Sequence, residues 1–270
     1  MLPWRKQNEE DWKLQVQRRQ ARLRRIKRKR RLRILKRILA AILLLIAVFI
    51  GVLWYNRYSI EKMRDSGEYP ESLLALAERN PETKQFVRDY PKNKDRQDEI
   101  DVSGEVKEGE IPLFLQWDER WGYQIYGDDF MAVTGCGPTC LSMVYCGLTG
   151  NADWNPLAVA KKADQKGYYV AGSGSSWSIM TDIAGELGLS ASEISLSETS
   201  IRSELEAGHP IICIVGPGDF TNGGHFIVLT GVDDKGNFII KDPNSKKNSS
   251  KAWDPERVMG QIRNLWSYSN

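Results

Sequence analysis

Thr134-Gly-Cys-Gly-Pro-Thr-Cys140 is the stretch that decides the fold, because it places a cysteine at the start of an apolar helical segment. A cysteine at a helix N-terminus lies beside unpaired backbone N–H groups and the positive end of the helix dipole, and both lower the pKa of its thiol. Gly135 and Gly137 keep the neighbouring backbone open, and Pro138 suits the first turn of a helix. Cys136 is therefore the candidate nucleophile.

A thiol nucleophile needs a base, and the chain contains two histidines, His209 and His225. His209 stands between Gly208 and Pro210, in a turn, where a histidine is typically a surface residue. His225 begins the apolar run 225–232 after Asn-Gly-Gly, and these glycines leave a side chain at the start of the strand accessible. Taken alone, His225 is better explained as a structural histidine at the edge of the core, with its hydrogen bonds satisfied, than as a catalytic base.

Asp242 changes this balance because it ends the strand that follows. A tight turn at residues 233–236 is predicted to pair the run 225–232 with residues 237–241 as an antiparallel hairpin. The start of the first strand and the end of the second then lie side by side, so the carboxylate can reach the imidazole and hold its tautomer. The alternative for Asp242 alone is an Asx-turn before Pro243.

An oxyanion stabiliser is the fourth part of such a site. Gln116 precedes Cys136 by 20 residues, and its side-chain amide, together with the backbone N–H of Cys136, would bind a developing oxyanion. An isolated glutamine carries no information, but this one completes a set of nucleophile, base, orienting acid and oxyanion donor.

The set resembles the papain superfamily, and specifically the bacteriocin-leader-processing peptidases, family thirty-nine of the clan CA cysteine peptidases. The likeness rests on Gln116 and on the segments 135–139, 220–228 and 242–245, which follow one another in the order that the family has. It covers about residues 111–270.

The resemblance assigns four roles, namely nucleophile to Cys136, general base and acid to His225, orientation of the imidazole to Asp242 and oxyanion binding to Gln116. It also implies cleavage of a peptide bond through a thioester, with no metal and no cofactor. Processing members of the family are usually fused to an exporter with several membrane spans and a nucleotide-binding domain, and this sequence has neither a second apolar span nor a phosphate-binding loop. Secreted peptides, surface proteins or wall peptides are therefore the expected substrates, rather than a double-glycine leader in the cytoplasm.

The pattern of residues 111–270 predicts helices first and antiparallel strands second, which is an α+β arrangement. By the resemblance it is papain-like, with a helical half that carries the nucleophile and a sheet half. The predicted helices cover residues 137–146, 155–166, 175–187, 197–207 and 254–265, and the predicted strands cover residues 211–215, 225–232 and 237–241.

The N-terminal region differs sharply in charge from the rest. Residues 1–37 hold 16 Lys or Arg against 3 Asp or Glu, a net charge of +13, although the net charge of the whole chain is +3. Residues 38–55 are 18 uncharged residues, which as a helix span about 27 Å of hydrocarbon. A cleaved signal peptide is the rival interpretation, but the basic region is too long for one, the apolar run exceeds the usual ~7–15 residues, and no cleavage site follows. A single transmembrane helix is expected.

The excess of basic residues before the span predicts a cytoplasmic N-terminus and an extracytoplasmic catalytic domain in a single-pass protein of the cell membrane. Lys and Arg clusters also bind phosphate groups, either of anionic lipid or of nucleic acid. Retention of the N-terminus is the preferred role of the arm. Anionic membrane lipid and a peptide or protein substrate are the expected partners, and nucleic acid is not.

Residues 56–110 are expected to form a stalk that includes a short helical collar. Prolines at 70, 81 and 91 punctuate two short amphipathic helices between Tyr69 and Tyr90, whereas residues 92–110 are mostly charged, as in a solvated linker.

The cysteines are not expected to form disulfides. Cys136, Cys140 and Cys146 fall in one helical segment, where side chains are poorly placed to bridge, and Cys213 lies within an apolar strand. Cys136 and Cys140 could supply the first two ligands of a zinc site, but no second closely spaced Cys or His pair is present to complete it, so zinc is not expected.

Two other functions remain compatible with the sequence. One is a catalytically silent peptidase-like module that binds leader or cell-wall peptides. The other is an acyl transferase, because an amine can resolve a thioester in place of water.

Overall fold

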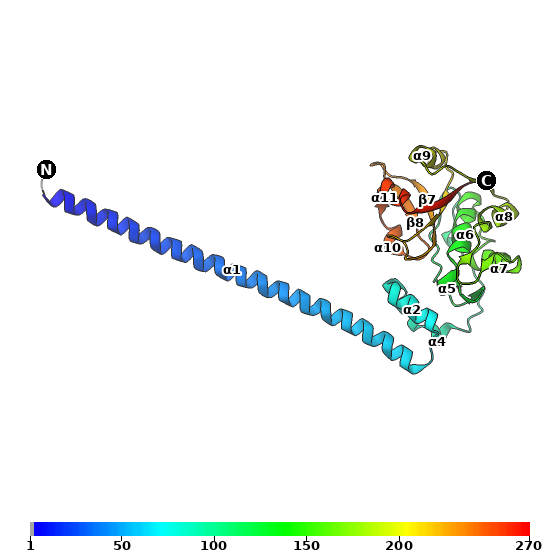
Figure 1. The fold of residues 1–270 in the computed structure, drawn as a ribbon, viewed down its shortest axis with the longest axis horizontal. Coiled ribbons are helices and arrows are strands. Elements are labelled where there is room, and N and C mark those ends of the chain that lie inside the picture. The colour runs from blue at the N-terminus through cyan, green and yellow to red at the C-terminus, as the bar shows by residue number, and fades with distance from the viewer. Residues whose placement is uncertain (1–2) are drawn as a thin grey trace. The chain divides into compact units, whose positions relative to one another are not determined.

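The structure is a computed structural model that describes residues 3–270. The chain divides into two compact units, one up to Glu61 and one from Lys62 to Asn270 (Figure 1). Helix α1 (Pro3–Ser66) makes up the first unit and ends within the second. The active-site residues predicted from the sequence all belong to the second unit.

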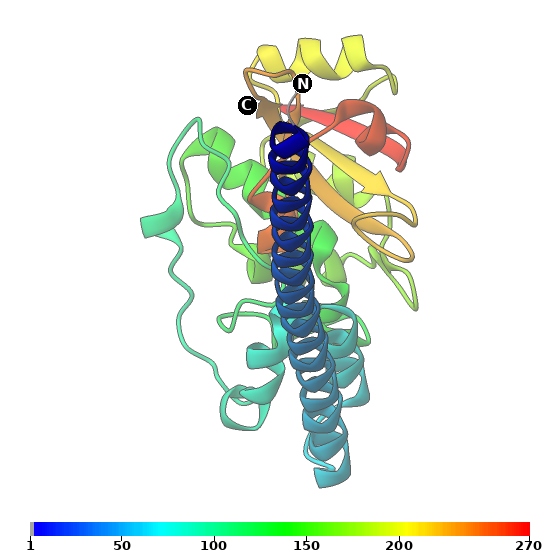
Figure 2. The ribbon, with the colours of Figure 1, turned by 90° about the vertical axis from the view of Figure 1, so that its left-hand side faces the viewer.

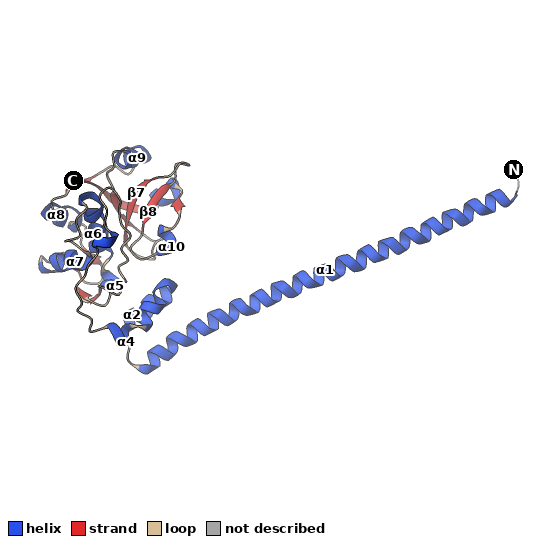
Figure 3. Cartoon of the chain, turned by 180° about the vertical axis from the view of Figure 1, so that it is seen from behind, coloured by secondary structure: helices blue, strands red, loops and turns tan. Residues whose placement is uncertain are grey.

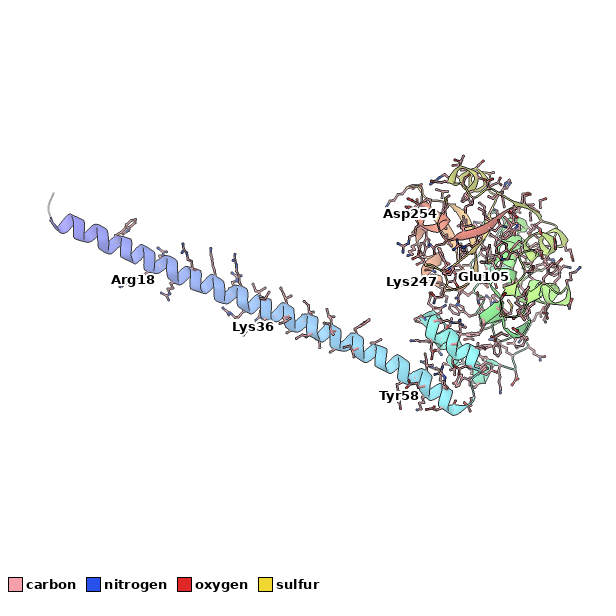
Figure 4. The ribbon with its side chains drawn as sticks, in the orientation of Figure 1. Arg18, Lys36, Tyr58, Glu105, Lys247 and Asp254 are labelled. Atoms are coloured by element: carbon pink, nitrogen blue, oxygen red, sulfur yellow. The ribbon has the colours of Figure 1, made fainter. Side chains whose placement is uncertain are left out.

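Helix α1 contains one stretch that is apolar and long enough to cross a membrane, Arg33–Val52, with 20 residues. It overlaps the predicted span at residues 38–55, and none of it is buried. Basic side chains such as Arg18 and Lys36 project from the helix before and within this stretch (Figure 4). A membrane span and a signal sequence both have this character.

A collar of short helices follows α1, with Pro70 just before α2 and Pro81 at the start of η1. It consists of α2 (Glu71–Arg79), the 3₁₀ turn η1 (Pro81–Thr83) and α3 (Lys84–Arg88), and we call residues 71–88 the collar. Helix α4 (Tyr90–Asn93) and the turn η2 (Ser103–Glu105) follow. In residues 92–110, the segment expected to be a solvated linker, most side chains are exposed, but Val102 is buried in the apolar core that also contains the side chains of α6 and α7.

The C-terminal half contains an antiparallel sheet (Figure 3). It has six strands in the order β5-β10-β6-β7-β8-β9. Its strands are β5 (Ser190–Glu193), β6 (Ile211–Val215), β7 (His225–Val232), β8 (Phe238–Lys241), β9 (Ala252–Trp253) and β10 (Ile262–Ser269). Two small hairpins precede it, β1 (Ile125–Tyr126) with β2 (Asp129–Phe130), and β3 (Tyr169–Val170) with β4 (Gly174–Ser175).

The other helices of this unit are α5 (Met131–Thr134), α6 (Cys136–Thr149), α7 (Pro156–Gln165), α8 (Ile179–Glu186), α9 (Glu198–Glu206), α10 (Lys246–Ser249) and α11 (Pro255–Met259). Helix α7 begins where its sequence signal lies, because the side chain of Asn155 accepts a hydrogen bond from the backbone N–H of Ala158. Helices followed by an antiparallel sheet confirm the α+β class.

The sheet separates two apolar cores. On one face α6 packs against β7, α8 packs against β5, and α7 packs on α6, and this core includes Ile212 and Phe226 of the central strands. On the other face α9 packs against β6 and β7, with Ile211 and Ile227 among the buried residues (Figure 2). Neighbouring residues of one strand thus face opposite cores, as the two-residue period of a strand requires.

Three predictions about these elements need correction. The helix predicted at residues 254–265 is wrong: α11 ends at Met259, and Ile262–Ser269 forms strand β10 between β5 and β6. Its apolar side chains alternate between the two cores, and pairing on both sides outweighs the local helical pattern. Helix α8 begins four residues later than predicted because Ser175 belongs to β4. Strand β5 was not predicted, since its residues Ser-Ala-Ser-Glu carry no apolar period.

Candidate active site

Cys136 is the first residue of helix α6 and lines an open cleft of about 870 Å³. The cleft passes over the starts of α6 and β7, so that Gln116 and His225 also line it. Its walls come from loops rich in glycine, residues 172–175 and 216–224, and from Trp177, whose side chain is 47% exposed. The thiol is therefore reachable from solvent along an extended surface.

Gly137 allows the close packing beneath the nucleophile. A Cβ atom at this position would lie 2.7 Å from Ser175 Oγ, closer than real Cβ contacts allow. Ser175 is in turn fixed by a 2.8 Å hydrogen bond with Tyr126 Oη. The Gly-Cys-Gly sequence thus lets the start of α6 approach strand β4.

His225 and Asp242 form the buried part of the site. His225 is 6% exposed, Asp242 is fully buried, and His225 Nε2 lies 2.8 Å from Asp242 Oδ1. With Nε2 engaged by the carboxylate, Nδ1 is the ring nitrogen left to hydrogen-bond the Cys136 thiol. The hairpin of β7 and β8 brings His225 and Asp242 together, and α6 supplies Cys136.

The electrostatics of the three side chains favour an ion pair between sulfur and imidazole. Burial alone would raise the pKa of Cys136, but the hydrogen bond and charge of His225 outweigh it, with help from the backbone N–H groups of Phe226 and Gly137, and the pKa is lowered. Burial alone would lower the pKa of His225, but the charge and hydrogen bond of Asp242, together with Cys136, raise it to about 10. The arrangement stabilises a thiolate beside an imidazolium.

Asp242 is held by a dense set of donors. Its Oδ1 also accepts from the backbone N–H of Asn244 at 2.8 Å, and its Oδ2 accepts from Asn248 Nδ2 at 2.8 Å. Its own backbone N–H donates to Ser249 Oγ at 2.9 Å. The Asn244 contact is the Asx-turn weighed as the alternative for Asp242, so one oxygen serves both the turn and the histidine.

Gln116 lies at the base of the cleft with 3% of its surface exposed. Its Nε2 donates to the carbonyl of Ala132 at 2.7 Å, while the carbonyl of Val133 is a distant 3.4 Å away. One amide hydrogen is thus committed and the second is only weakly held. The Oε1 atom has no hydrogen-bond partner within residues 3–270.

The remaining cysteines and the second histidine lie apart from this chemistry. All four cysteines, which fall within the described residues, are free, and Cys140, Cys146 and Cys213 are buried. Burial raises the pKa of each of these three thiols. His209 Nδ1 pairs with Glu204 Oε2 at 2.8 Å and does not line the cleft. Within residues 3–270 no group of three or more His, Cys, Asp or Glu side chains could hold a metal ion.

Sequence reasoning missed the side chains that support the site from outside it. Asn248 and Ser249 hold Asp242, and the sequence offers only a weak signal for them, the Asn-Ser turn that begins at Asn244. Asn80 and Glu82 contact the same loop from far away in the chain, and no local pattern points to such a contact.

Two comparisons with known proteins found similar sequences or structures. A family model described as the Peptidase_C39 like family matches residues 108–270. Among solved structures, the peptidase domain of Streptococcus ComA, described as a bi-functional ABC transporter involved in a quorum sensing pathway, is similar at 20% identity, covers 50% of this chain and 91% of its own, and has a TM-score of 0.37. Among curated proteins no sequence matches this chain.

Proposed function

The chain belongs to the Peptidase_C39 like family, and we propose from this premise that it is a cysteine peptidase in which Cys136 is the nucleophile. The family match confirms the resemblance drawn from the motifs. One observation carries the proposal: a thiol at the start of a helix and an imidazole that a fully buried carboxylate orients line the same open cleft.

The reaction starts from the thiolate and imidazolium pair. The sulfur of Cys136 attacks the carbonyl carbon of the scissile bond, and the electron pair of the C=O bond moves to its oxygen. The backbone N–H of Cys136 and the loosely held hydrogen of Gln116 Nε2 stabilise this oxyanion. As the C–N bond breaks, the imidazolium of His225 gives its proton to the departing amine, and a thioester remains on the sulfur.

Water then resolves the thioester. The imidazole, now neutral, removes a proton from water as the oxygen attacks the carbonyl, and the thiolate departs. Asp242 keeps the Nε2–H of His225 on its own side throughout both steps, so that Nδ1 remains the nitrogen that exchanges protons.

The test of this proposal compares the chain with its Cys136→Ala and Cys136→Ser variants. The parent should cleave members of a random peptide library, detected by mass spectrometry, and should be labelled by an iodoacetamide probe at Cys136. Both variants should lose all cleavage and nearly all labelling, because the other three thiols are buried with raised pKa values. Cleavage that persists in Cys136→Ser would refute the assignment. Products extended by an amine instead of water would identify an acyl transferase.

We also propose that α1 anchors the protein in the cell membrane with the N-terminus in the cytoplasm and the catalytic cleft outside. The apolar stretch Arg33–Val52 and the net charge of +13 in residues 1–37 support this orientation. A reporter that is active only outside the cytoplasm, fused at Asn270, should then be active. Replacing the basic residues of the arm by Gln should reduce its activity, and equal activity in both fusions would contradict the proposal.

The outside location fits a substrate that is a secreted or surface peptide, and the basic arm fits the anionic lipid of the inner leaflet. Vesicles with and without anionic lipid would test the second point. A synthetic peptide of residues 1–32 should bind only the anionic vesicles, and this binding should weaken as salt is raised.

A further inference from the structure

The collar, residues 71–88, lies outside the part of the chain that the family model matches, yet it reaches the cleft. Leu76, Arg79 and Asn80 all line the cleft that contains Cys136. The collar is fastened to the rest of its unit at both ends: Ser72 Oγ donates to Asp129 Oδ1 at 2.8 Å, and Phe86 stacks on Tyr123 with ring centroids 4.1 Å apart. It is thus a built wall of the cleft.

Two collar residues hold the loop that carries Asp242. Asn80 Nδ2 donates to the backbone carbonyl of Asn244 at 2.6 Å and to its side-chain oxygen at 3.1 Å. The carboxylate of Glu82 accepts from Ser245 Oγ at 2.6 Å and from the backbone N–H of Lys246 at 2.9 Å. The helix that these contacts hold, α10, carries Lys247, and it lies next to α2 (Figures 1 and 4).

The residues that hydrogen-bond to the collar are the same as, or next to, those that hydrogen-bond to the carboxylate of Asp242. Asn244, held by Asn80, donates its backbone N–H to Asp242 Oδ1. Ser245, held by Glu82, caps α10 by accepting from the backbone N–H of Asn248, and Asn248 donates its side chain to Asp242 Oδ2. Oδ1 of the carboxylate is therefore linked to the collar through one residue, Asn244, and Oδ2 through two, Asn248 and Ser245.

We propose that the collar is a working part of the catalytic site, in which Asn80 and Glu82 are positioning residues that hold the Asp242 loop and thereby the imidazole of His225. This inference rests on the proposed function, because it concerns the same nucleophile and base. Loosening the loop weakens the hold of Asp242 on the imidazolium. The thiolate of Cys136 then loses its counter-ion, and the pH at which it forms rises.

The experiment measures the rate of Cys136 alkylation by iodoacetamide against pH in the full chain, which needs no knowledge of the substrate. Two mild variants separate the contacts. Asn80→Asp keeps the oxygen that accepts from the backbone N–H of Glu82 but loses the donor to Asn244, and Glu82→Gln keeps the size and one acceptor. Glu82→Ala removes the second grip entirely. The matched control is Glu78→Ala, which removes a collar carboxylate on α2 that pairs with Arg64.

Alkylation near pH 6 should fall roughly tenfold in Asn80→Asp and in Glu82→Ala, less in Glu82→Gln, and not at all in Glu78→Ala. On a peptide that the parent cleaves, kcat should fall by a similar factor with a smaller change in KM, because the carboxylate acts on the chemical step. A variant that unfolds exposes the three buried thiols and is recognised by alkylation at all four cysteines. In that case the two mild variants, Asn80→Asp and Glu82→Gln, test the role of the collar.

The outcomes separate this inference from the proposed function. A parent profile with an ordinary thiol midpoint near pH ~8.5 would overturn the proposed function itself. A parent profile shifted to low pH, with folded Asn80→Asp and Glu82→Ala variants that reproduce it and keep the parent kcat, would overturn only the role of the collar.

Discussion

Asp242→Asn is the substitution that tests the electrostatics of the site most directly. The side chain is fully buried and accepts hydrogen bonds on both oxygens, and asparagine has nearly the same shape. The Oδ1 of asparagine can still accept from His225 Nε2 and from the backbone of Asn244. The new Nδ2 group faces the Nδ2 of Asn248, so the amide of Asn248 must turn to present its oxygen as the acceptor. The substitution then removes the charge while it keeps the shape of the side chain.

The expected magnitude follows from the pKa of His225, which the structure raises to about 10. Burial opposes this rise, and Asp242 is its largest favourable cause, so without the charge the pKa should return to its ordinary value of ~6.5 or lower. The equilibrium between the thiolate–imidazolium pair and the neutral pair then shifts by roughly three powers of ten, equivalent to about 4 kcal/mol. At neutral pH kcat/KM should fall by about 10²–10³-fold, since the ion pair is the reactive form.

The assay combines thiolate absorbance in the ultraviolet with the alkylation rate of Cys136, both recorded against pH. In Asp242→Asn the thiolate signal should appear only at a pH well above that of the parent. Asp233→Asn, the same change at the turn end of the same hairpin, is the control and should leave the profile unchanged. A folded Asp242→Asn protein with the parent profile would refute the view that this carboxylate stabilises the imidazolium.

Three other outcomes follow from single contacts. The alkylation rate of Cys136 should rise at a pH below the ordinary thiol range, because the thiolate forms above the lowered pKa of Cys136. The peptidase activity should fall again near pH ~10, because the imidazolium is lost above the pKa of His225. A rise in the alkylation rate only near pH ~8.5 would contradict the ion pair. Asn155→Ala should lower the free energy of unfolding, measured in urea, by about 1 kcal/mol through loss of the cap on α7, and Asn155→Ser should restore most of it. Gly127→Ala should lower the free energy of unfolding by at least about 2 kcal/mol, because Gly127 has a φ of 71° and a Cβ there would lie 2.2 Å from the ring of Tyr169. Peptide binding should also weaken, because Tyr169 lines the cleft, and an unchanged KM would contradict this second effect.

The features that the sequence predicted correctly are local ones. The α6 segment has a helix-start motif followed by an apolar run, and the β7 and β8 strands flank a turn of four polar or glycine residues. The side chain of Asn155 caps α7 and that of Ser197 caps α9, and both residue types favour the N-cap position. Each of these signals lies within a few residues of the element that it specifies.

The features that were missed depend on distant partners. Strand β10 reads locally as a continuation of α11, and only its two neighbours β5 and β6 make it a strand. The grip of Glu82 on Ser245 joins residues 163 positions apart. A pattern of residue types has no access to such pairings, because the same local sequence is compatible with several partners.

The predicted hairpin brings Asp242 next to His225, but their proximity depends on a detail of the strand register that the sequence does not reveal. At the turn Val232 pairs with Phe238, whereas further along Leu229 pairs with Ile240, so β7 contributes one more residue than β8 between these pairs. Thr230 is this extra residue, a β-bulge. It keeps Leu229 and Ile240 in the same core.

The same bulge decides whether a triad can form. The register beyond it pairs Val228 with Lys241, so Asp242 follows opposite Ile227, on the face of the sheet that His225 shares by the two-residue period. Without the extra residue Asp242 would lie opposite Val228, on the other face, and the carboxylate would point away from the imidazole. The hydrophobic pattern that buries Leu229 and Ile240 therefore also selects the register in which His225 and Asp242 meet, and the chemistry of the cleft depends on the packing of this core.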